Sequence, residues 1–284
     1  PGAHFRALLA QAAATDFAQR LDTAMGEIEA ENSALKGVLY REFSRLELEP
    51  GKLGDLMALI ATISFNPADH GSRDVFGEVY EYFLGKFALK EGARAGEFYT
   101  PKNVVNLLVE ILAPFKGKIY DPACGSGGMF VQSAKFKDAH QATFGRKGDL
   151  AIYGQEMMAA TRRLCLMNLA VHGLEGDLGQ SYGDTFANDQ HKTLRADYVL
   201  ANPPFNISDW GGDKLKEDPR WAYGIPPTGN ANFAWLQHML ARLNSRGRAG
   251  IVLANGSMSS QQSGEGDIRR GMVQADVVEC IVAL

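Results

Sequence analysis

Cysteine is scarce in this chain. Its three cysteines among 284 residues, Cys124, Cys165 and Cys280, lie far apart and form no Cys-x-x-Cys pair or Cys/His cluster. This spacing argues against a disulfide framework and against a zinc site. The six histidines show no metal-ligand spacing either, so no metal is expected. Few, scattered cysteines are typical of a protein from a reducing cytoplasm.

Long hydrophobic runs and a strong charge of one sign are also missing. No run approaches the roughly 18 apolar residues that a membrane-spanning helix needs, so no membrane partner is expected. The N-terminus lacks the order of a signal peptide. It begins Pro1-Gly2 without methionine, which predicts a fragment or a processed chain. A net charge of -4 argues against a protein that grips nucleic acid by bulk charge alone.

The remaining composition, 45% hydrophobic and 22% charged, is that of a soluble globular protein with one large or two modest domains. Apolar residues at helical spacing, clearest over 74–89, predict a helical domain over residues 1–90 that carries no obvious chemistry. Over residues 91–284, short β-rich runs alternate with helical patterns. Strands are expected at 118–120, 151–153, 196–201, 249–253 and 277–284, and helices at 104–112, 129–135, 159–172, 233–243 and 268–275.

This alternation of strands and helices predicts an α/β fold, with a mostly parallel sheet covered by helices on both faces. Ligands of such sheets bind at the carboxyl ends of the strands. Three elements of unusual composition fall at those ends: a glycine-rich loop, an acid after the second strand, and an Asn-Pro-Pro-Phe sequence. They are the candidate site.

The glycine-rich loop, residues 121–128, reads Asp-Pro-Ala-Cys-Gly-Ser-Gly-Gly. Glycines there let the backbone turn tightly and approach a ligand closely. The loop is neither a P-loop nor a Gly-x-Gly-x-x-Gly sequence. Its leading acid, Asp121, is suited to the cationic amino group of a methionine moiety, with the backbone at 126–128 beside the ligand. A plain glycine-rich turn is the alternative.

Glu156 follows the second expected strand, 28 residues after Gly128. In Rossmann-like folds an acid at this place accepts hydrogen bonds from ribose hydroxyls. An exposed strand-end acid is the alternative. Asp184, which directly follows residues 180–183, is a candidate for the adenine end of a cofactor, and an ordinary turn or helix-cap aspartate is the alternative there.

The Asn-Pro-Pro-Phe sequence directly follows the strand expected at 196–201. Two prolines remove backbone donors and leave carbonyl groups free to accept from a ligand, and Asn202 adds an amide. An exocyclic amine held by two acceptors loses conjugation with its ring, so its lone pair becomes nucleophilic. Phe205 offers an aromatic face for a base extruded from a duplex, worth roughly 1–3 kcal/mol. A proline-terminated strand with a core Phe is the alternative.

Taken together, these motifs resemble the modification (methylation) subunit of type I restriction–modification systems, an N6-adenine DNA methyltransferase. Residues 202–205 resemble the catalytic motif of adenine amino-methyltransferases, and residues 121–128 resemble their cofactor loop. Residues 97–102 resemble the upstream cofactor motif of the subgroup in which it comes first. Further matching segments are 206–212, 229–235 and 253–257. The resemblance covers residues 30–284 and depends on the combination, since each short motif alone is unspecific.

The resemblance implies a Rossmann-like S-adenosylmethionine-dependent methyltransferase domain over residues 91–284, with an N-terminal helical domain over 1–90. The implied catalytic residues are Asn202, Pro203, Pro204 and Phe205. The implied cofactor-binding residues are Glu97, Phe98, Tyr99, Thr100, Pro101, Lys102, Asp121, Gly125, Ser126, Gly127, Gly128, Glu156 and Asp184.

The resemblance also implies double-stranded DNA as substrate, in the cytoplasm of a bacterium or archaeon. It implies two copies of this subunit on one DNA-specificity subunit, joined in some systems by a restriction subunit. Target reading by a partner would explain the acidic net charge. This chain departs from the family in a short N-terminal domain and in ending where the family continues with another strand and a partner-binding tail.

Two other functions remain open from the residues alone. Asn-Pro-Pro-aromatic sequences also serve the methylation of protein glutamine or of an RNA base, although the Phe-Tyr-Thr-Pro sequence at 98–101 favours DNA. The chain could instead be a cofactor-binding scaffold that serves only assembly. Lys214, Lys216 and Arg220 follow the catalytic motif and are candidates for DNA phosphate contacts, with a solvated loop as the alternative.

Overall fold

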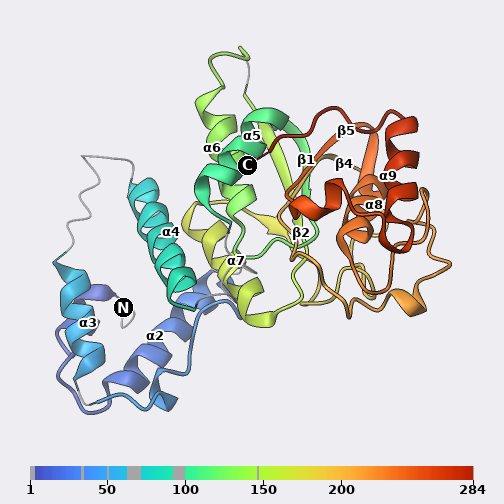
Figure 1. Cartoon of the computed structure of the whole chain (residues 1–284). Helices are drawn as coiled ribbons and strands as arrows, with labels where there is room; N and C mark the ends of the chain where they lie inside the picture. The colour runs from blue at the N-terminus through green and yellow to red at the C-terminus, as the bar shows by residue number, and fades with distance from the viewer. Residues whose placement is uncertain are drawn as a thin grey trace. The chain divides into compact units, whose positions relative to one another are not determined.

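The structure is a computed structural model that describes residues 4–32, 35–49, 51–62, 72–91, 100–145 and 147–283. These divide into two compact units. The helical unit comprises Pro1–Phe83 and Leu166–Glu175, and the sheet unit comprises Leu84–Cys165 and Gly176–Leu284. Figure 1 shows the elements of both units along the chain.

The helical unit contains α1 (Phe5–Leu9), α2 (Phe17–Glu31), η2 (Phe43–Arg45), α3 (Lys52–Ala61) and the first part of α4 (Ser72–Glu91). Its core is a cluster of buried apolar side chains from α1, α2 and α3, namely Leu8, Phe17, Leu21, Ala24 and Met57. The helical character expected for the N-terminal part of the chain is confirmed. Among the described helices, none is both long and apolar enough to cross a membrane.

The sheet unit is built on five parallel strands in the order β3-β2-β1-β4-β5. The strands are β1 (Lys116–Asp121), β2 (Asp149–Gly154), β3 (Gly176–Asp177), β4 (Ala196–Ala201) and β5 (Leu243–Ile251). The helices are α5 (Lys102–Leu112), α6 (Gly128–Ala139), the first part of α7 (Ala159–Val171), α8 (Asn232–Arg242) and α9 (Glu265–Gln274), with short 3-10 turns η4 (Gly212–Lys214), η5 (Asn255–Met258) and η6 (Gln262–Gly264). The expected parallel α/β fold is confirmed.

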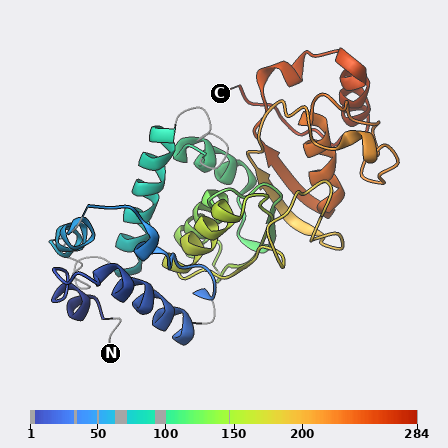
Figure 2. The ribbon, with the colours of Figure 1, turned by 90° about the horizontal axis from the view of Figure 1, so that it is seen from below.

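Successive side chains of a strand point to opposite faces of the sheet, and helices pack against both faces. On one face, Tyr120 and Val199 pack with Met239 of α8. On the other face, Gly250 of β5 lies against Leu108 and Leu112 of α5, and a Cβ at Gly250 would come within 2.9 Å of Leu112. Figure 2 shows the sheet between the green helices and the orange to red helices.

The strand expected at 277–284 does not form: residues 277–283 belong to no strand, and Ile281 is 61% exposed. A strand needs a ladder of backbone hydrogen bonds with a neighbour, which an apolar run does not supply. Here a side-chain ion pair, Arg248 Nη2 to Glu279 Oε2 at 2.6 Å, ties the segment to β5. The apolar run was therefore a misleading signal.

Parallel register places the candidate residues at one edge of the sheet. Asp121, the last residue of β1, pairs with Gly154, the last residue of β2. Tyr120 pairs with Val199, so β4 ends beside β1 and Asn202 follows at the same edge. The glycine-rich loop, the acid after β2 and the Asn-Pro-Pro-Phe sequence therefore share the carboxyl edge, as expected for this class of sheet.

Candidate active site

The loop after β1 is held against the end of β2 by backbone hydrogen bonds. The Gln155 N–H donates to Asp121 O, and the Cys124 N–H donates to Gln155 O, both at 3.0 Å. Asp121 is 2% exposed, and its Oδ1 accepts from the Ala123 N–H at 2.9 Å. Burial raises the pKa of Asp121 to about 8, with a further rise from the Glu156 charge and an opposing effect of the Ala123 N–H. A cation at this position would favour the ionised carboxylate.

The two last glycines of the loop have different surroundings. Gly127 has φ +83°, and a Cβ there would lie 2.8 Å from Cys165 Sγ, so glycine is required by the fold itself. A Cβ at Gly128, the first residue of α6, would meet no atom within 4 Å among the described residues. The space beside Gly128 is therefore available to a ligand that approaches the backbone closely, as expected for residues 126–128.

Glu156 joins the loop to the end of β2. Its Oε2 accepts from the Gly125 N–H at 3.1 Å and its Oε1 accepts from the Met158 N–H at 2.7 Å. The side chain is 9% exposed, and burial raises its pKa despite these backbone donors. An exposed strand-end acid, the alternative weighed from the sequence, does not describe this residue.

Asp184 lies in a turn held by Gln155. Asp184 Oδ1 accepts from the backbone N–H groups of Phe186 at 2.7 Å and Ala187 at 2.8 Å. Gln155 is fully buried, and its Nε2 donates to Gly183 O at 3.0 Å. The structure thus gives Asp184 a turn-stabilising role, and its contact with an adenine stays a prediction.

Asn202 follows β4 directly, and its two amide atoms differ in their partners. Nδ2 donates to Thr100 Oγ1 at 3.1 Å, which joins the catalytic motif to the upstream motif. Oδ1 is buried and accepts no hydrogen bond from the residues that the structure describes. Because an unsatisfied buried acceptor costs about 1–3 kcal/mol, this oxygen is suited to a ligand that donates a hydrogen.

The three residues after Asn202 differ in exposure, and one of them presents an aromatic ring to solvent. Pro203 is buried and Pro204 half-buried, whereas the Phe205 side chain is 44% exposed. A half-exposed aromatic ring is available for stacking, so the core-Phe alternative does not hold. Of the upstream motif, Pro101 and Lys102 begin α5 with exposed side chains. Glu97, Phe98 and Tyr99 lie outside the described residues.

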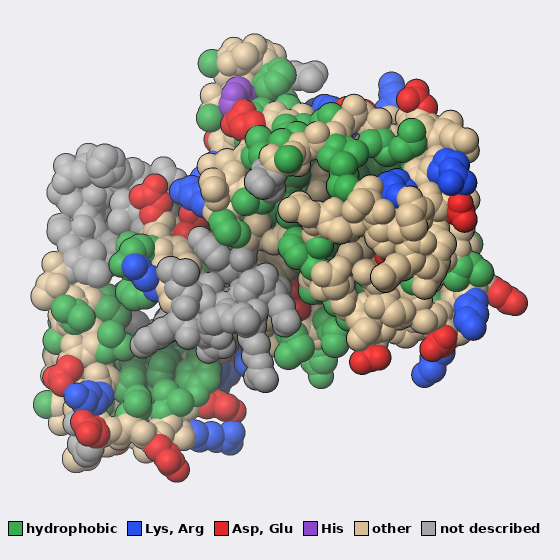
Figure 3. Space-filling view, viewed as in Figure 1, with side chains coloured by type: hydrophobic (Ala, Val, Ile, Leu, Met, Phe, Trp, Pro, Cys, Tyr) green, Lys and Arg blue, Asp and Glu red, His purple; other side chains and the backbone are tan. Residues whose placement is uncertain are grey.

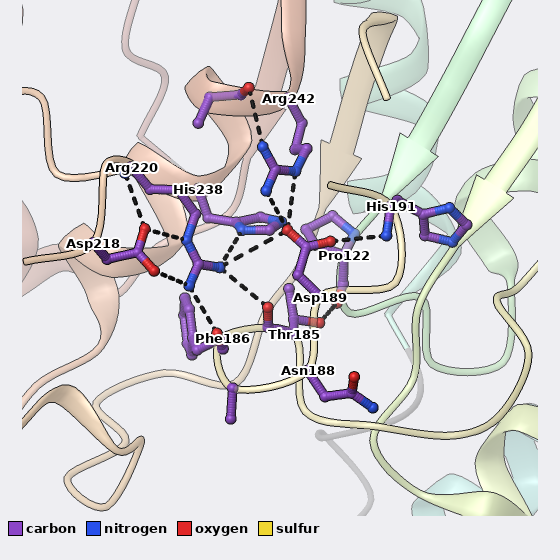
Figure 4. A network of polar contacts seen from close by, with 12 residues as sticks. Pro122, Thr185, Phe186, Asn188, Asp189, His191, Asp218, Arg220, His238 and Arg242 are labelled. Atoms are coloured by element: carbon purple, nitrogen blue, oxygen red, sulfur yellow. Dashed lines mark hydrogen bonds and ion pairs between the residues drawn. The ribbon is translucent and has the colours of Figure 1, made fainter. Parts of the chain in front are cut away.

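A buried polar network behind the site was not anticipated from the sequence (Figure 4). Arg220 Nη1 donates to Thr185 O at 3.2 Å and Nη2 donates to Phe186 O at 2.7 Å. Thr185 Oγ1 in turn donates to Pro122 O at 2.5 Å. The loop after the catalytic motif is thereby tied to the glycine-rich loop through the Arg220 guanidinium and the Thr185 hydroxyl.

The charges in this network are balanced. Arg220 pairs with Asp218, Nη2 to Oδ2 at 2.7 Å, and Arg242 pairs with Asp189. Arg220 Nη1 also lies 3.0 Å from His238 Nδ1. Since a guanidinium only donates, that nitrogen is the acceptor and the ring is neutral; burial lowers the pKa of His238 to about 3.

Arg220 is 6% exposed, so the expectation that it touches DNA phosphates is wrong. The sequence placed it near two lysines in a polar loop and contained no signal for its burial. Its partners Thr185 and Asp189 lie more than 25 residues away in the chain. Lys216 is exposed and lies 4.0 Å from Asp213, and its phosphate contact stays a prediction.

The sheet order β3-β2-β1-β4-β5, with the candidate site at the carboxyl edge, is that of a Rossmann-like α/β fold. A Listeria monocytogenes protein described as a class I S-adenosylmethionine-dependent methyltransferase has a similar structure, with a TM-score of 0.60 at 14% identity over 96% of this chain and 77% of that one.

A family model described as N-6 DNA methylase matches residues 71–284. The chain belongs to this family. It is 46% identical to the methylase subunit of the type I restriction enzyme HindI from Haemophilus influenzae, over 94% of this chain and 61% of that protein. It also resembles the methyltransferase subunit of a type I restriction-modification system from Streptococcus thermophilus, with a TM-score of 0.77 and 25% identity, over 96% of this chain and 60% of that one. The chain thus spans about three fifths of these two relatives.

Proposed function

We propose that this chain transfers a methyl group from S-adenosylmethionine to the N6 amino group of adenine in DNA, as the modification subunit of a type I restriction–modification system. The observation that carries the proposal is the Asn202 amide at the end of β4. Its nitrogen is fixed by Thr100, and its buried oxygen has no donor among the described residues. An adenine amino group would supply that donor. Family membership and the names of the relatives support the same reaction.

The described residues fit the cofactor. The open space beside Gly128 admits a ligand to the loop, and buried Asp121 is suited to its amino group. Glu156, whose oxygens hold Gly125 and Met158, borders the same loop and is the candidate for the ribose. S-adenosylmethionine supplies a methyl group already activated by its sulfonium. We assign cofactor binding to residues 97–102, 121, 125–128, 156 and 184.

The catalytic motif then has three tasks. Asn202 Oδ1 accepts from the amino group and draws it out of conjugation with the ring, so that its lone pair can attack. The Asn202 carboxamide is neutral and does not act as a base. The amino nitrogen loses its proton after the methyl group has been transferred. Phe205 stacks on the base, which must leave the duplex to reach this edge of the sheet. Pro203 and Pro204 hold the turn rigidly, because their rings restrict φ.

DNA recognition is assigned to partners. The relatives are named as subunits of type I restriction enzymes, and a net charge of -4 does not favour DNA binding by this chain alone. We propose an assembly of two copies with one specificity subunit and, for cleavage, a restriction subunit. Relatives in bacteria and archaea support the cytoplasm of such a cell as its location.

Labelled methyl transfer tests the proposal. The chain is purified with its specificity subunit and incubated with labelled S-adenosylmethionine and either DNA, RNA or protein, and the modified DNA positions are mapped. We expect label only in DNA, at adenine N6. Asn202→Ala should abolish methyl transfer while calorimetry still detects cofactor binding. Asn32→Ala, an exposed change in the helical unit, should keep both methyl transfer and cofactor binding. Full transfer by Asn202→Ala would refute the mechanism, and label in protein or RNA alone would refute the substrate.

A further inference from the structure

Three sequence segments matched the family but carried no assigned chemistry: residues 206–212, 229–235 and 253–257. In the structure, a polar side chain from the second segment bonds to one polar side chain from each of the other two, directly after the catalytic motif. These are Asn206, Asn232 at the start of α8, and Ser257 in η5. We call this set the amide clamp. Segments of different origin converge on the residue that follows Phe205, so the clamp bears on the orientation of that ring.

Asn232 is the centre of the amide clamp. Its Oδ1 accepts from the Asn206 N–H at 3.0 Å. Its Nδ2 donates to Asn206 Oδ1 at 2.9 Å and to Ser257 Oγ at 3.1 Å. Asn232 is 2% exposed, so its own amide atoms are shielded from water, and the bond to Ser257 is buried. An amide is the group that satisfies this geometry, since one end must accept and the other must donate twice.

The amide clamp stabilises a backbone conformation that is unfavourable by itself. Asn206 has φ +56°, in the left-handed region, which costs roughly 1–2 kcal/mol for an L-residue and is best tolerated by Asn, Asp and Gly. The chain reverses there, and the Ala231 N–H donates to Ile207 O at 3.0 Å. Trp210 further on is 4% exposed while Phe205 is 44% exposed. The turn at Asn206 thus lies in the chain between an exposed Phe205 and a buried Trp210.

We infer that Asn232 is a positioning residue that acts through Asn206 to hold the Phe205 ring where it can stack on an extruded adenine. This inference rests on the proposed function. Loosening the clamp should leave the cofactor loop intact, because the clamp forms no hydrogen bond to residues 121–128 within the part of the chain that the structure describes. It should instead weaken the capture of the base, which a residue that only stabilises α8 would not do.

The experiment uses one chemical change at the two ends of the same pair. Asn232→Asp keeps the acceptor for the Asn206 N–H but removes both donors. Asn206→Asp keeps the acceptor for Asn232 Nδ2, because the Asn206 side chain takes part in the clamp only through its Oδ1. Each variant is assembled with the specificity subunit and bound at saturation to a duplex with 2-aminopurine at the mapped target adenine. Fluorescence of the extruded base, kcat on ordinary DNA, and cofactor Kd are measured.

We expect Asn232→Asp to lose most of the 2-aminopurine signal and at least ten-fold in kcat, with cofactor Kd within two-fold of wild type. Asn206→Asp should stay within about three-fold of wild type in signal and kcat. If Asn232→Asp fails to fold, Asn206→Gly takes its place. Glycine keeps the φ of +56° at low cost but removes the acceptor, so it should lose the signal as well.

Unchanged signal and kcat in Asn232→Asp, or in the substituted Asn206→Gly, overturn the inference. So does an equal loss of signal and cofactor affinity, which would mark Asn232 as a general structural residue. A wild-type complex that methylates no DNA overturns the proposed function and the inference with it. The two failures are distinguishable, because the inference fails alone only when the wild-type complex is active.

Discussion

At the scale of single residues, Asp121 shows how burial prepares a group for a charged ligand. Its side chain is 2% exposed, and its pKa of about 8 leaves most of the carboxyl protonated at neutral pH. An approaching ammonium group reverses this balance, since an opposite charge favours the ionised form. Cofactor binding should therefore be linked to the release of a proton.

We predict release of close to one proton when S-adenosylmethionine binds at pH 7. Calorimetry in two buffers of different ionisation enthalpy measures this number directly. Asp121→Asn should bind more weakly and release none from this position. Identical heats in both buffers for the wild-type chain would contradict the prediction.

The same group makes the fold sensitive to pH. A carboxyl with a raised pKa binds its proton in the folded state when the unfolded state has lost it, so stability falls as pH rises from about 4 to about 8. Tm measured between pH 6 and 8 should fall more steeply for wild type than for Asp121→Asn. Parallel Tm curves would place the pH dependence in other groups.

Gly127 and Gly128 are a second residue-scale contrast. Gly127→Ala should destabilise the fold by about 1–2 kcal/mol or more, because φ is +83° and the new Cβ meets Cys165 Sγ. Gly128→Ala meets open space and should retain or slightly raise Tm, while cofactor Kd weakens at least ten-fold. Thermal melts and calorimetry on both variants check this, and unchanged affinity in Gly128→Ala would show that the space is not used.

At the scale of elements, paired charges hold the loops around the sheet edge together. Arg242 of α8 reaches Asp189 in the loop before β4, and Arg220 reaches the carbonyls of Thr185 and Phe186 in that same loop (Figure 4). Each of these charges is buried, so removing its closest partner leaves a buried charge that is poorly compensated.

We predict that Arg242→Met destabilises the protein by about 3–5 kcal/mol, since Asp189 loses its closest cation. Arg270→Met is the matched control: Arg270 pairs with Asp267 in α9 at 2.8 Å with both side chains exposed, so little change is expected. Urea unfolding of both variants measures the difference. Equal free energies of unfolding for the two variants would show that the network does not stabilise these loops.

At the scale of the whole molecule, the distribution of charge supports the proposal that a partner recognises the DNA. On the face shown in Figure 3, basic and acidic side chains of the described residues are interspersed and form no continuous basic area. The chain also spans about three fifths of its relatives. The domain boundary at residue 90 stays a prediction, since the compact units divide after Phe83 and the helical unit includes Leu166–Glu175.

We predict that the chain alone binds DNA no more tightly than non-specific proteins do, with Kd weaker than about 10⁻⁶ M at physiological salt. With the specificity subunit, binding should tighten by at least 100-fold. Fluorescence anisotropy of a labelled duplex, with and without that subunit, checks this. Tight binding by the chain alone would refute the division of labour.

Much of the fold and of the site could be predicted because the relevant signals are local. The alternation of strands and helices was visible, and the motifs at 121–128, 156 and 202–205 follow their strands directly. Since the ends of parallel strands meet at one edge, sequence order alone indicated that these motifs come together. The expected strand at 277–284 failed because pairing depends on a neighbour, which no local pattern contains.

The sequence by itself therefore determined the class of fold, the family, and the meeting of Asn202 and the two acids at one edge of the sheet. Only the tertiary structure decided which atoms of those residues are already engaged: Thr100 holds one end of the Asn202 amide and leaves the other end unpaired among the described residues. It also decided the burial of Arg220 and the joining of Asn206, Asn232 and Ser257. The physical reason is that burial and hydrogen-bond satisfaction depend on neighbours distant in the chain, whereas strand ends and motif chemistry are encoded within a few consecutive residues.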